Sequence, residues 1–282
     1  MPLQFDMADP MRPESHTRAP GWGRVTSWLR LARETYVALP LAALVLLVLG
    51  WVGVLHMIEA KQSEAIETAR ASALELINTY EAQVARNLDA IDQTLKVLRY
   101  AFELKGAQSA LPTLDAEGLL PAGVVFDVRI ADRNGIIVAS NPAAGNKVDI
   151  SAQDYFTFHR NNPGDDPYVS QVTRDPSNPE PHLHFTRRIS DAQGQFAGVV
   201  VLEVAPAYFT SGYERARQGE HGLLGLVGTD GVFRVRRTGD EVSWGQRPPQ
   251  LGEGDSLAPG SADGVRRFLN VRKMDGFPLY AV

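Results

Sequence analysis

The stretch His182–Val204, with the sequence HLHFTRRISDAQGQFAGVVVLEV, contains two strand-like runs separated by a short polar segment. The first run ends at Ser190, and the second begins at Gln195 and is mostly apolar. Between them, Asp191-Ala192-Gln193-Gly194 supplies a glycine for the backbone position with positive φ that a tight turn requires. The stretch therefore predicts an antiparallel β-hairpin.

The same strand–turn–strand pattern occurs four times in the chain, and every turn contains an Asp and a Gly. The other three pairs of predicted strands are Val124–Ala131 with Ile136–Ser140, Leu223–Val227 with Val232–Val235, and Val265–Lys273 with Phe277–Val282. Two successive pairs of hairpins predict two antiparallel-sheet modules in tandem, of which the second is shorter. One continuous sandwich is the competing interpretation.

A long apolar segment precedes these strands. Residues Tyr36–Ile58 contain no Asp, Glu, Lys or Arg. As a helix the segment would extend about 35 Å, which is enough to cross a hydrocarbon core of about 30 Å. Its length and lack of a polar face argue against a buried helix of a soluble protein, and its position argues against a cleaved signal peptide. The sequence therefore predicts an uncleaved transmembrane helix over residues 36–58.

Charged residues flank this segment asymmetrically. The basic residues before it are Arg18, Arg24, Arg30 and Arg33, and the acidic residues after it are Glu59, Glu64 and Glu67. Because basic flanks stay in the cytoplasm, residues 1–35 are predicted to be a cytoplasmic tail and residues 59–282 to be exported.

Residues 59–104 contain neither Gly nor Pro, which predicts one long helix. Apolar residues recur along it at spacings of three and four, at Ala73, Ile77, Tyr80, Val84, Leu88, Ile91, Leu95, Leu98 and Phe102. This seam is typical of a helix with one buried face. It predicts either a stalk that pairs with a second copy or a spine against which a domain packs, and the two can occur in succession.

The composition excludes several functional classes. The 282 residues include 28 Lys and Arg against 33 Asp and Glu, so the chain lacks the basic surface that nucleic-acid binding requires. The absence of cysteine excludes disulfides and thiolate chemistry. His182 and His184 have the spacing of a metal pair on one strand face, but hydrogen-bonded histidines are the simpler interpretation. No catalytic arrangement is recognised, so we expect no metal, no cofactor and no enzymatic activity from this chain.

Four further segments carry a family resemblance: ADRNGIIVASNP (131–142), VDISAQDYFTFH (148–159), HFTRRISDAQGQFAGVVVLEV (184–204) and PAYFTSGYE (206–214). With the anchor and the long helix before them, they resemble the double Cache (PDC) sensor domain of bacterial transmembrane receptors. The fold class is therefore expected to be α+β, with a transmembrane helix, a long helix and two tandem PAS-like modules.

The resemblance implies a membrane-distal module over residues 105–212 and an incomplete membrane-proximal module over residues 213–282. It also implies periplasmic exposure in the cell inner membrane, a homodimer, and a cytoplasmic output domain. A diguanylate cyclase is the expected output, with a histidine kinase or a chemoreceptor as alternatives. No output segment follows Val282, so we expect the chain to be a fragment or a truncated form.

The resemblance places a small-molecule pocket in the first module, and a small organic acid or amino acid is the expected ligand. The predicted ligand-binding residues are Tyr155, His159, Tyr168, Arg174, His184, Thr186, Arg187 and Arg188. Since side chains alternate along a strand, at most one of Arg187 and Arg188 should line the pocket, and a structural ion pair is the alternative role for either.

Similar sequences often have an Arg where this chain has Gln153. If that Arg helps to bind an anion, one positive charge is missing here, and the ligand is expected to differ or to be absent. Two other functions compete with small-molecule sensing. One is a dimerisation or binding module that needs no ligand. The other is an anchored exported enzyme, which no motif in the sequence supports.

Overall fold

The computed structural model describes residues 22–106, 109, 111–112, 114, 126–141, 148–175, 178–213, 222–248, 254–258 and 267–282. It has two parts, residues 1–66 and residues 67–282, which are described separately. Most of the predicted cytoplasmic tail lies outside the described residues, as do the first two residues of the strands predicted at 124 and 265.

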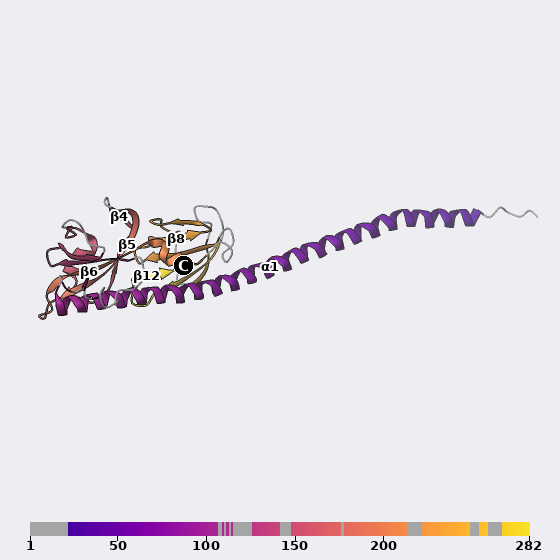
Figure 1. The fold of residues 1–282 in the computed structure, drawn as a ribbon. Helices are drawn as coiled ribbons and strands as arrows, with labels where there is room; N and C mark the ends of the chain where they lie inside the picture. The colour runs from indigo at the N-terminus through magenta and orange to yellow at the C-terminus, as the bar shows by residue number, and fades with distance from the viewer. Residues whose placement is uncertain are drawn as a thin grey trace, which may run out of the picture. The chain divides into compact units, whose positions relative to one another are not determined.

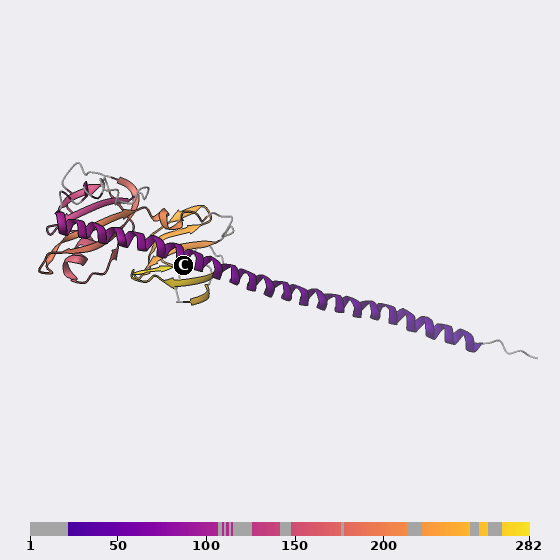
Figure 2. The ribbon, with the colours of Figure 1, turned by 60° about the horizontal axis from the view of Figure 1, so that its bottom comes forward.

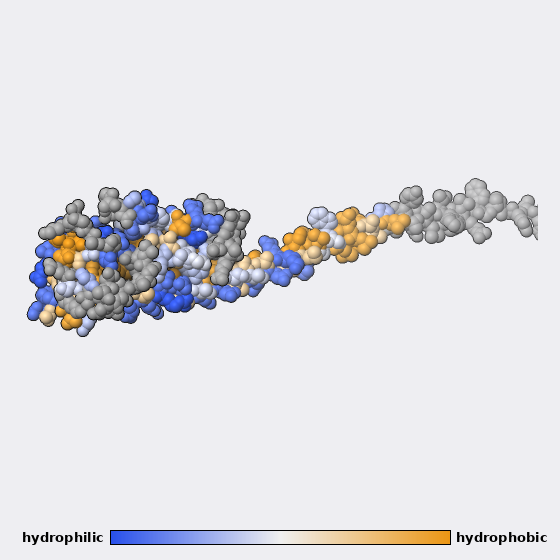
Figure 3. Space-filling model, viewed as in Figure 1, coloured by the Kyte–Doolittle hydropathy of each residue, from blue (hydrophilic) through white to orange (hydrophobic). Residues whose placement is uncertain are grey.

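The helix α1 (Trp22–Lys105) begins in the first part, where it includes the predicted transmembrane segment, and continues into the second. Among the described residues, α1 is the one helix long and apolar enough to cross a membrane, judged by length and composition, and its apolar window is unburied. The described side chains of this segment form a mostly apolar surface (Figure 3). A single helix therefore covers the two helices predicted at 36–58 and 59–104, because no helix-breaking residue separates them.

The second part contains two antiparallel sheets (Figure 1). In the first sheet the strand order is β2 (Ile137–Asn141), β1 (Phe126–Asp132), β6 (Phe196–Val204), β5 (Asn178–Ser190) and β3 (Tyr168–Val169), and β4 (Thr173–Asp175) also pairs with β5. The helix α3 (Asp154–Asn161) lies between β2 and β3 in the sequence.

The second sheet follows the short 3-10 helix η1 (Pro206–Thr210). Its strand order is β10 (Gly254–Ala258), β11 (Arg267–Lys273), β12 (Leu279–Ala281), β7 (Leu223–Gly228), β8 (Phe233–Thr238) and β9 (Glu241–Ser243). The predicted α+β class, with a long apolar helix followed by two antiparallel sheets, is confirmed. All four predicted hairpins are present as β1–β2, β5–β6, β7–β8 and β11–β12.

The Asp–Gly turns owe their shape to side-chain hydrogen bonds. Oδ1 of Asp191 accepts hydrogen bonds from the backbone N–H groups of Gln193 (3.0 Å) and Gln195 (2.8 Å), and Gly194 adopts a φ of 76°. Asp132 makes the equivalent pair of bonds in the β1–β2 turn. In these two hairpins, an Asp at the first turn position and a Gly at the last are therefore the local signal from which the turn could be predicted.

The predicted seam is the face of α1 that packs against both sheets. Its residues between 77 and 98 are buried, and they share one core with side chains of β5 and β6 in the first sheet and of β7 and β8 in the second. The rings of Tyr80 and Tyr213 meet edge to face, with centroids 5.3 Å apart. Figure 2 shows this part of α1 lying along both sheets. The helix was predicted to be either a stalk that pairs with a second copy or a spine against which a domain packs. Within one chain, the seam packs as a spine.

The first sheet is covered on both faces. The even-numbered residues Val200, Leu202 and Val204 of β6 face the core shared with α1, whereas Val199 and Val201 face a second core formed with α3. This alternation follows from the two-residue period of a strand. The face covered by α3 carries most of the predicted ligand-binding residues.

We predict that truncation of Leu95 strongly destabilises the chain. Leu95 is fully buried in the seam, so Leu95→Ala should lower the free energy of unfolding by about 2–5 kcal/mol. Leu104→Ala, at a position of the same helix that is 64% exposed, is the matched control and should change it by less than about 0.5 kcal/mol. Urea unfolding of the full chain in detergent, followed by circular dichroism, measures both. Equal effects of the two variants would contradict the packing of α1.

Candidate functional site

The α3-covered face of the first sheet is built from residues that the strand register aligns across β1, β6 and β5. One row is Asp127, Glu203 and His184, and the next is Arg129, Val201 and Thr186. The third row is Ala131, Val199 and Arg188. Directly opposed residues of antiparallel strands point to the same face, so these side chains form one continuous surface under α3.

The helix α3 covers this surface with an apolar side. Tyr155, Phe156 and His159 are buried, and Tyr155 and Phe156 pack with Ile137, Val199 and other apolar residues of the second core. Asp154 lies in the first turn and Arg160 in the last, which suits the helix dipole. The sequence DYFTFHR thus places two predicted residues, Tyr155 and His159, on the buried side of the helix.

His159 is held in a buried polar contact. Its Nε2 lies 2.9 Å from Oγ1 of Thr186, and its backbone oxygen accepts a hydrogen bond from Nη1 of Arg188 at 2.5 Å. Nδ1 of His159 is buried and has no hydrogen-bond partner among the described residues. Burial lowers the pKa of His159 to about 4, and the charge of Arg188 adds to this effect. The imidazole is therefore neutral at pH 7.

His184 connects the helix to a buried carboxylate. The ring of Tyr155 stacks on the His184 ring, with centroids 5.0 Å apart and planes at 28°. Nε2 of His184 lies 3.4 Å from Oε1 of Glu203, which also pairs with Nη1 of Arg129 at 3.0 Å. On the other edge of the ring, Nδ1 lies 3.3 Å from the hydroxyl of Ser170. The site therefore contains acceptors, donors and aromatic rings within one chain of contacts.

Two further predicted residues complete this face. Arg188 is buried, and its guanidinium lies over the ring of Phe196 at 5.0 Å from the ring centroid. Tyr168 of β3 is half-buried and packs against Phe158 at a centroid distance of 4.9 Å. The structure thus brings together Tyr155, His159, Tyr168, His184, Thr186 and Arg188.

Arg187 lies on the opposite face of β5, as strand alternation predicts. Its Nε donates to Oδ1 of Asp92 on α1 at 2.7 Å, and Nη2 lies 2.5 Å from the same oxygen. Nη1 lies 3.3 Å from Oδ2 of Asp165. Because both Arg187 and Asp92 are largely buried, this is the structural ion pair named as the alternative role.

Arg174 and Gln153 lie away from the α3-covered face. The guanidinium of Arg174 lies over the ring of Trp244, 5.5 Å from its centroid, at the joint between the two sheets. Gln153 is exposed and precedes α3, where its side chain makes no capping bond. Its backbone oxygen instead accepts hydrogen bonds from Phe156 and Thr157.

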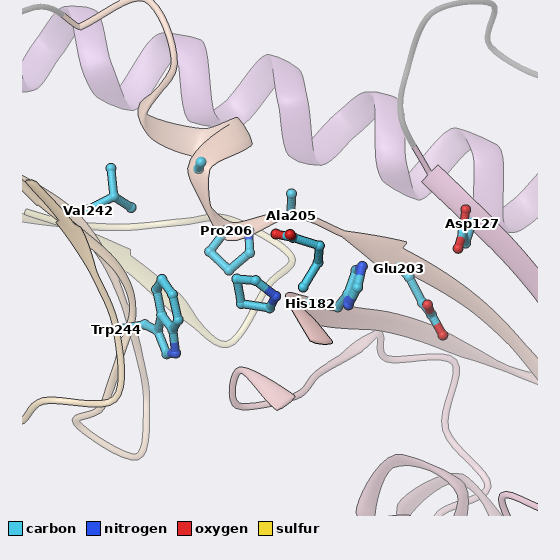
Figure 4. Close-up of a pocket in the computed structure, with 10 residues that line it drawn as sticks. Asp127, His182, Glu203, Ala205, Pro206, Val242 and Trp244 are labelled. Atoms are coloured by element: carbon cyan, nitrogen blue, oxygen red, sulfur yellow. The ribbon is translucent and has the colours of Figure 1, made fainter. Parts of the chain in front are cut away.

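A cavity of about 420 Å³ continues the surface toward the second sheet. Figure 4 shows Trp244 and Val242 on one side of it, and His182, Glu203 and Asp127 on the other. Asp127, Glu203 and Trp244 were not among the predicted site residues. Glu203 and Asp127 each had a signal, as a charged residue in a mostly apolar predicted strand, whereas their alignment with one another depends on the strand register.

His182 and His184, the spacing of which resembles a metal pair, have different surroundings. His184 bonds to Ser170 and Glu203, while His182 lines the cavity. Within the described ranges, no group of three or more His, Cys, Asp or Glu residues is arranged to hold a metal ion. The hydrogen-bonded interpretation therefore accounts for His184.

No family model and no curated protein matches the chain. Solved structures do match its fold. The extracellular domain assigned to the histidine kinase rpHK1S-Z16 aligns at a TM-score of 0.63 and 17% identity, over 77% of this chain and 94% of the other. The ligand-binding domain of the Pseudomonas fluorescens chemoreceptor CtaA, in complex with L-serine, aligns at a TM-score of 0.58 and 15% identity, over 76% and 96%.

The ligand-binding domain of the Pseudomonas aeruginosa PAO1 amino acid chemoreceptor PctB, in complex with L-Arg, aligns at a TM-score of 0.57 and 17% identity, over 74% and 91%. The chain has the fold of extracellular ligand-binding domains. At these identities the likeness concerns the fold, so the ligand and the output have to be argued from the chain itself.

We predict that Arg187 contributes to stability through Asp92. Arg187→Ala leaves the largely buried Asp92 carboxylate with Lys96, at 2.7 Å, as its remaining partner, so it should lower the free energy of unfolding by about 1–3 kcal/mol. Arg133→Ala is the control, because Arg133 is exposed and its ion pair with Asp191 spans 4.0 Å. That variant should cost at most about 1 kcal/mol. Chemical unfolding of the full chain at pH 7 compares the two.

The difference between wild type and Arg187→Ala should also depend on pH. Burial raises the pKa of Asp92, but hydrogen bonds from Lys96 and Arg187 outweigh burial and hold the pKa below its ordinary value of 3.8. A group with a lowered pKa stabilises the fold above its unfolded pKa and loses that contribution as the pH falls. The stability difference should be complete at pH 7 and shrink below about pH 4. A difference that does not change with pH would exclude this ion pair as its source.

Proposed function

We propose that residues 59–282 are the extracytoplasmic, ligand-sensing region of a membrane signalling receptor of the double Cache type. The observation that carries this proposal is that one helix, α1, includes both an unburied apolar segment and the buried seam of an extracellular ligand-binding fold. The similarity of the fold to histidine kinase and chemoreceptor domains supports it. In this proposal residues 105–212 form the membrane-distal module and residues 213–282 the membrane-proximal one.

The proposed ligand site is the α3-covered face, and the proposed ligand is a small organic acid or amino acid. Arg188 and Arg129 supply guanidinium groups suited to a carboxylate, and Glu203 supplies an acceptor suited to an amino group. Tyr155, stacked on the His184 ring, provides a flat aromatic wall. Two of the similar domains, those of CtaA and PctB, hold L-serine and L-Arg, which supports an amino acid.

The proposed transmission route is the packing of α1. A ligand that binds one arrangement of α3 and the first sheet more tightly than another shifts the balance between them by that difference in affinity. The first sheet contacts α1 through the buried seam and through Arg187 and Asp92. A change in the sheet therefore acts directly on the helix that includes the apolar segment.

We propose a homodimeric receptor whose output domain is a diguanylate cyclase, on the resemblance of the sequence. A histidine kinase is the second candidate, which the similarity to the rpHK1S-Z16 extracellular domain favours. Reading the coding sequence beyond Val282 distinguishes them. A ligand-independent dimerisation module is the alternative function, favoured by the length of α1.

Ligand binding is tested with the full chain in lipid nanodiscs by calorimetry against amino acids and small organic acids. We expect at least one compound to bind saturably. Thr186→Val removes the hydroxyl that lies 2.9 Å from Nε2 of His159 on α3 and so alters the position of α3 on the sheet, which should weaken binding roughly tenfold, or about 1.4 kcal/mol. Thr157→Val is the matched control, since the Thr157 hydroxyl only bonds to a backbone oxygen of its own helix. No binding by any compound, or equal losses in both variants, would count against the proposed site.

The proposed topology is tested with single-cysteine variants, because the natural chain contains no cysteine. A membrane-impermeant maleimide added to intact spheroplasts should label Gln193→Cys, at an exposed turn, and should not label Ser15→Cys. As a control, both variants should be labelled after detergent lysis, which shows that both thiols can react. The reverse pattern would invert the proposed orientation.

A further inference from the structure

We propose that the 420 Å³ cavity at the joint between the two sheets is a second ligand site, which takes a small organic cation: a protonated amine with a short apolar body. The cavity and the α3-covered face share two residues, Asp127 and Glu203, and the other lining residues of the cavity lie outside that face. The proposal does not depend on the identity of the ligand at the α3-covered face.

The size and walls of the cavity suit a small amphipathic molecule. Its volume falls within the range of about 300–1,000 Å³ that is usual for ligand pockets. Pro181, Ala205, Pro206 and Val242 give it apolar walls. Figure 4 shows Pro206 between Trp244 and the side that carries His182 and Glu203. An apolar body is therefore accommodated between the proline and indole rings.

Carboxylates form the polar side of the cavity. Asp127, Glu180 and Glu203 line it, whereas no Lys or Arg is among its described lining residues. The guanidinium groups beside this side are Arg129 on Glu203 and Arg174 over Trp244, and His182 and His184 are the titratable imidazoles that face it. A lining of three carboxylates favours a cation over an anion.

Two observations support an affinity for cations. Burial, and secondly the charge of Glu203, raise the pKa of Asp127 above its usual range, although Arg129 and His182 act in the opposite direction. A bound cation beside Asp127 would relieve this. The Trp244 ring already attracts one cation, since the Arg174 guanidinium lies 5.5 Å from its centroid.

A ligand at this place contacts both sheets. Asp127, His182 and Glu203 belong to β1, β5 and β6 of the first sheet, whereas Val242 belongs to β9 of the second and Trp244 directly follows it. Contacts that join the sheets near the cavity include the hydrogen bond from Gln171 to Asp230 at 2.9 Å and the Arg174 guanidinium over Trp244. An occupant of the cavity therefore adds a direct link between the modules.

The test uses Trp244 as its own reporter. The chain has four tryptophans, and replacing the other three (Trp22→Phe, Trp28→Phe and Trp51→Phe) in the full chain leaves Trp244 as the single emitter. The chain in lipid nanodiscs is titrated with 2-phenylethylamine, with the neutral 2-phenylethanol and with the anionic 3-phenylpropionate. We expect a saturable change in Trp244 emission with the amine, and affinity at least roughly tenfold lower for the alcohol and the acid.

The carboxylate is tested by Asp127→Asn, which should weaken the amine roughly tenfold and leave the alcohol unchanged. Asp275→Asn, at an exposed turn outside the cavity, is the control and should have no effect. If Asp127→Asn does not fold, Glu180→Gln at an exposed lining position makes the same comparison. No saturable change with the amine overturns the proposal, and so does equal binding of amine and alcohol. An amine affinity that neither carboxylate variant lowers overturns it too.

Discussion

The burial of one face of α1 under both sheets is the constraint on which the rest of the second part depends. Seven large side chains of the seam, from Ile77 to Leu98, are almost completely buried. Each such side chain contributes about 1.5–3 kcal/mol through burial. Both sheets share this single surface, so the packing of one sheet on the helix limits the packing of the other. The ion pair of Arg187 and Asp92 adds a directional contact to an otherwise non-directional interface.

The elements whose signals are local can be predicted from the sequence. The hairpin β5–β6 is predictable because Asp191 and Gly194 specify a turn between two strand-forming runs. The seam is predictable because its spacing identifies one face of a helix. Periodicity does not say what covers that face, so the choice between a spine and a pairing stalk has to come from the structure. The composition changes from apolar to charged at Glu59, which suggests a boundary between two helices at that residue. Helix propensity does not change at this point, however, and α1 is continuous.

The candidate site is only partly predictable, because it depends on the register between strands. Alternation separates Arg187 from Arg188 correctly, but it does not say which of them faces α1. That depends on how β5 pairs with β6, and on which face α3 covers. Asp127 is visible as a charged residue in an apolar run, but no local signal places it beside Glu203, because the two meet through the β1–β6 ladder across a long sequence separation. Trp244 comes from another hairpin altogether, and no local pattern connects it with the first module.

Glu203 occupies the position where the two proposed sites meet. Its carboxylate pairs with Arg129 and His184, the His184 ring stacks on Tyr155, and the same residue lines the cavity beside Asp127. A cation in the cavity would compete with Arg129 for this carboxylate, and an anion under α3 would compete with the carboxylate for Arg129. Each ligand would then free the partner group that the other one binds. For an organic acid under α3, charge alone therefore favours joint occupancy, and by linkage each ligand raises the affinity for the other by the same factor. The amino group of an amino acid under α3 would instead compete with the cation for Glu203.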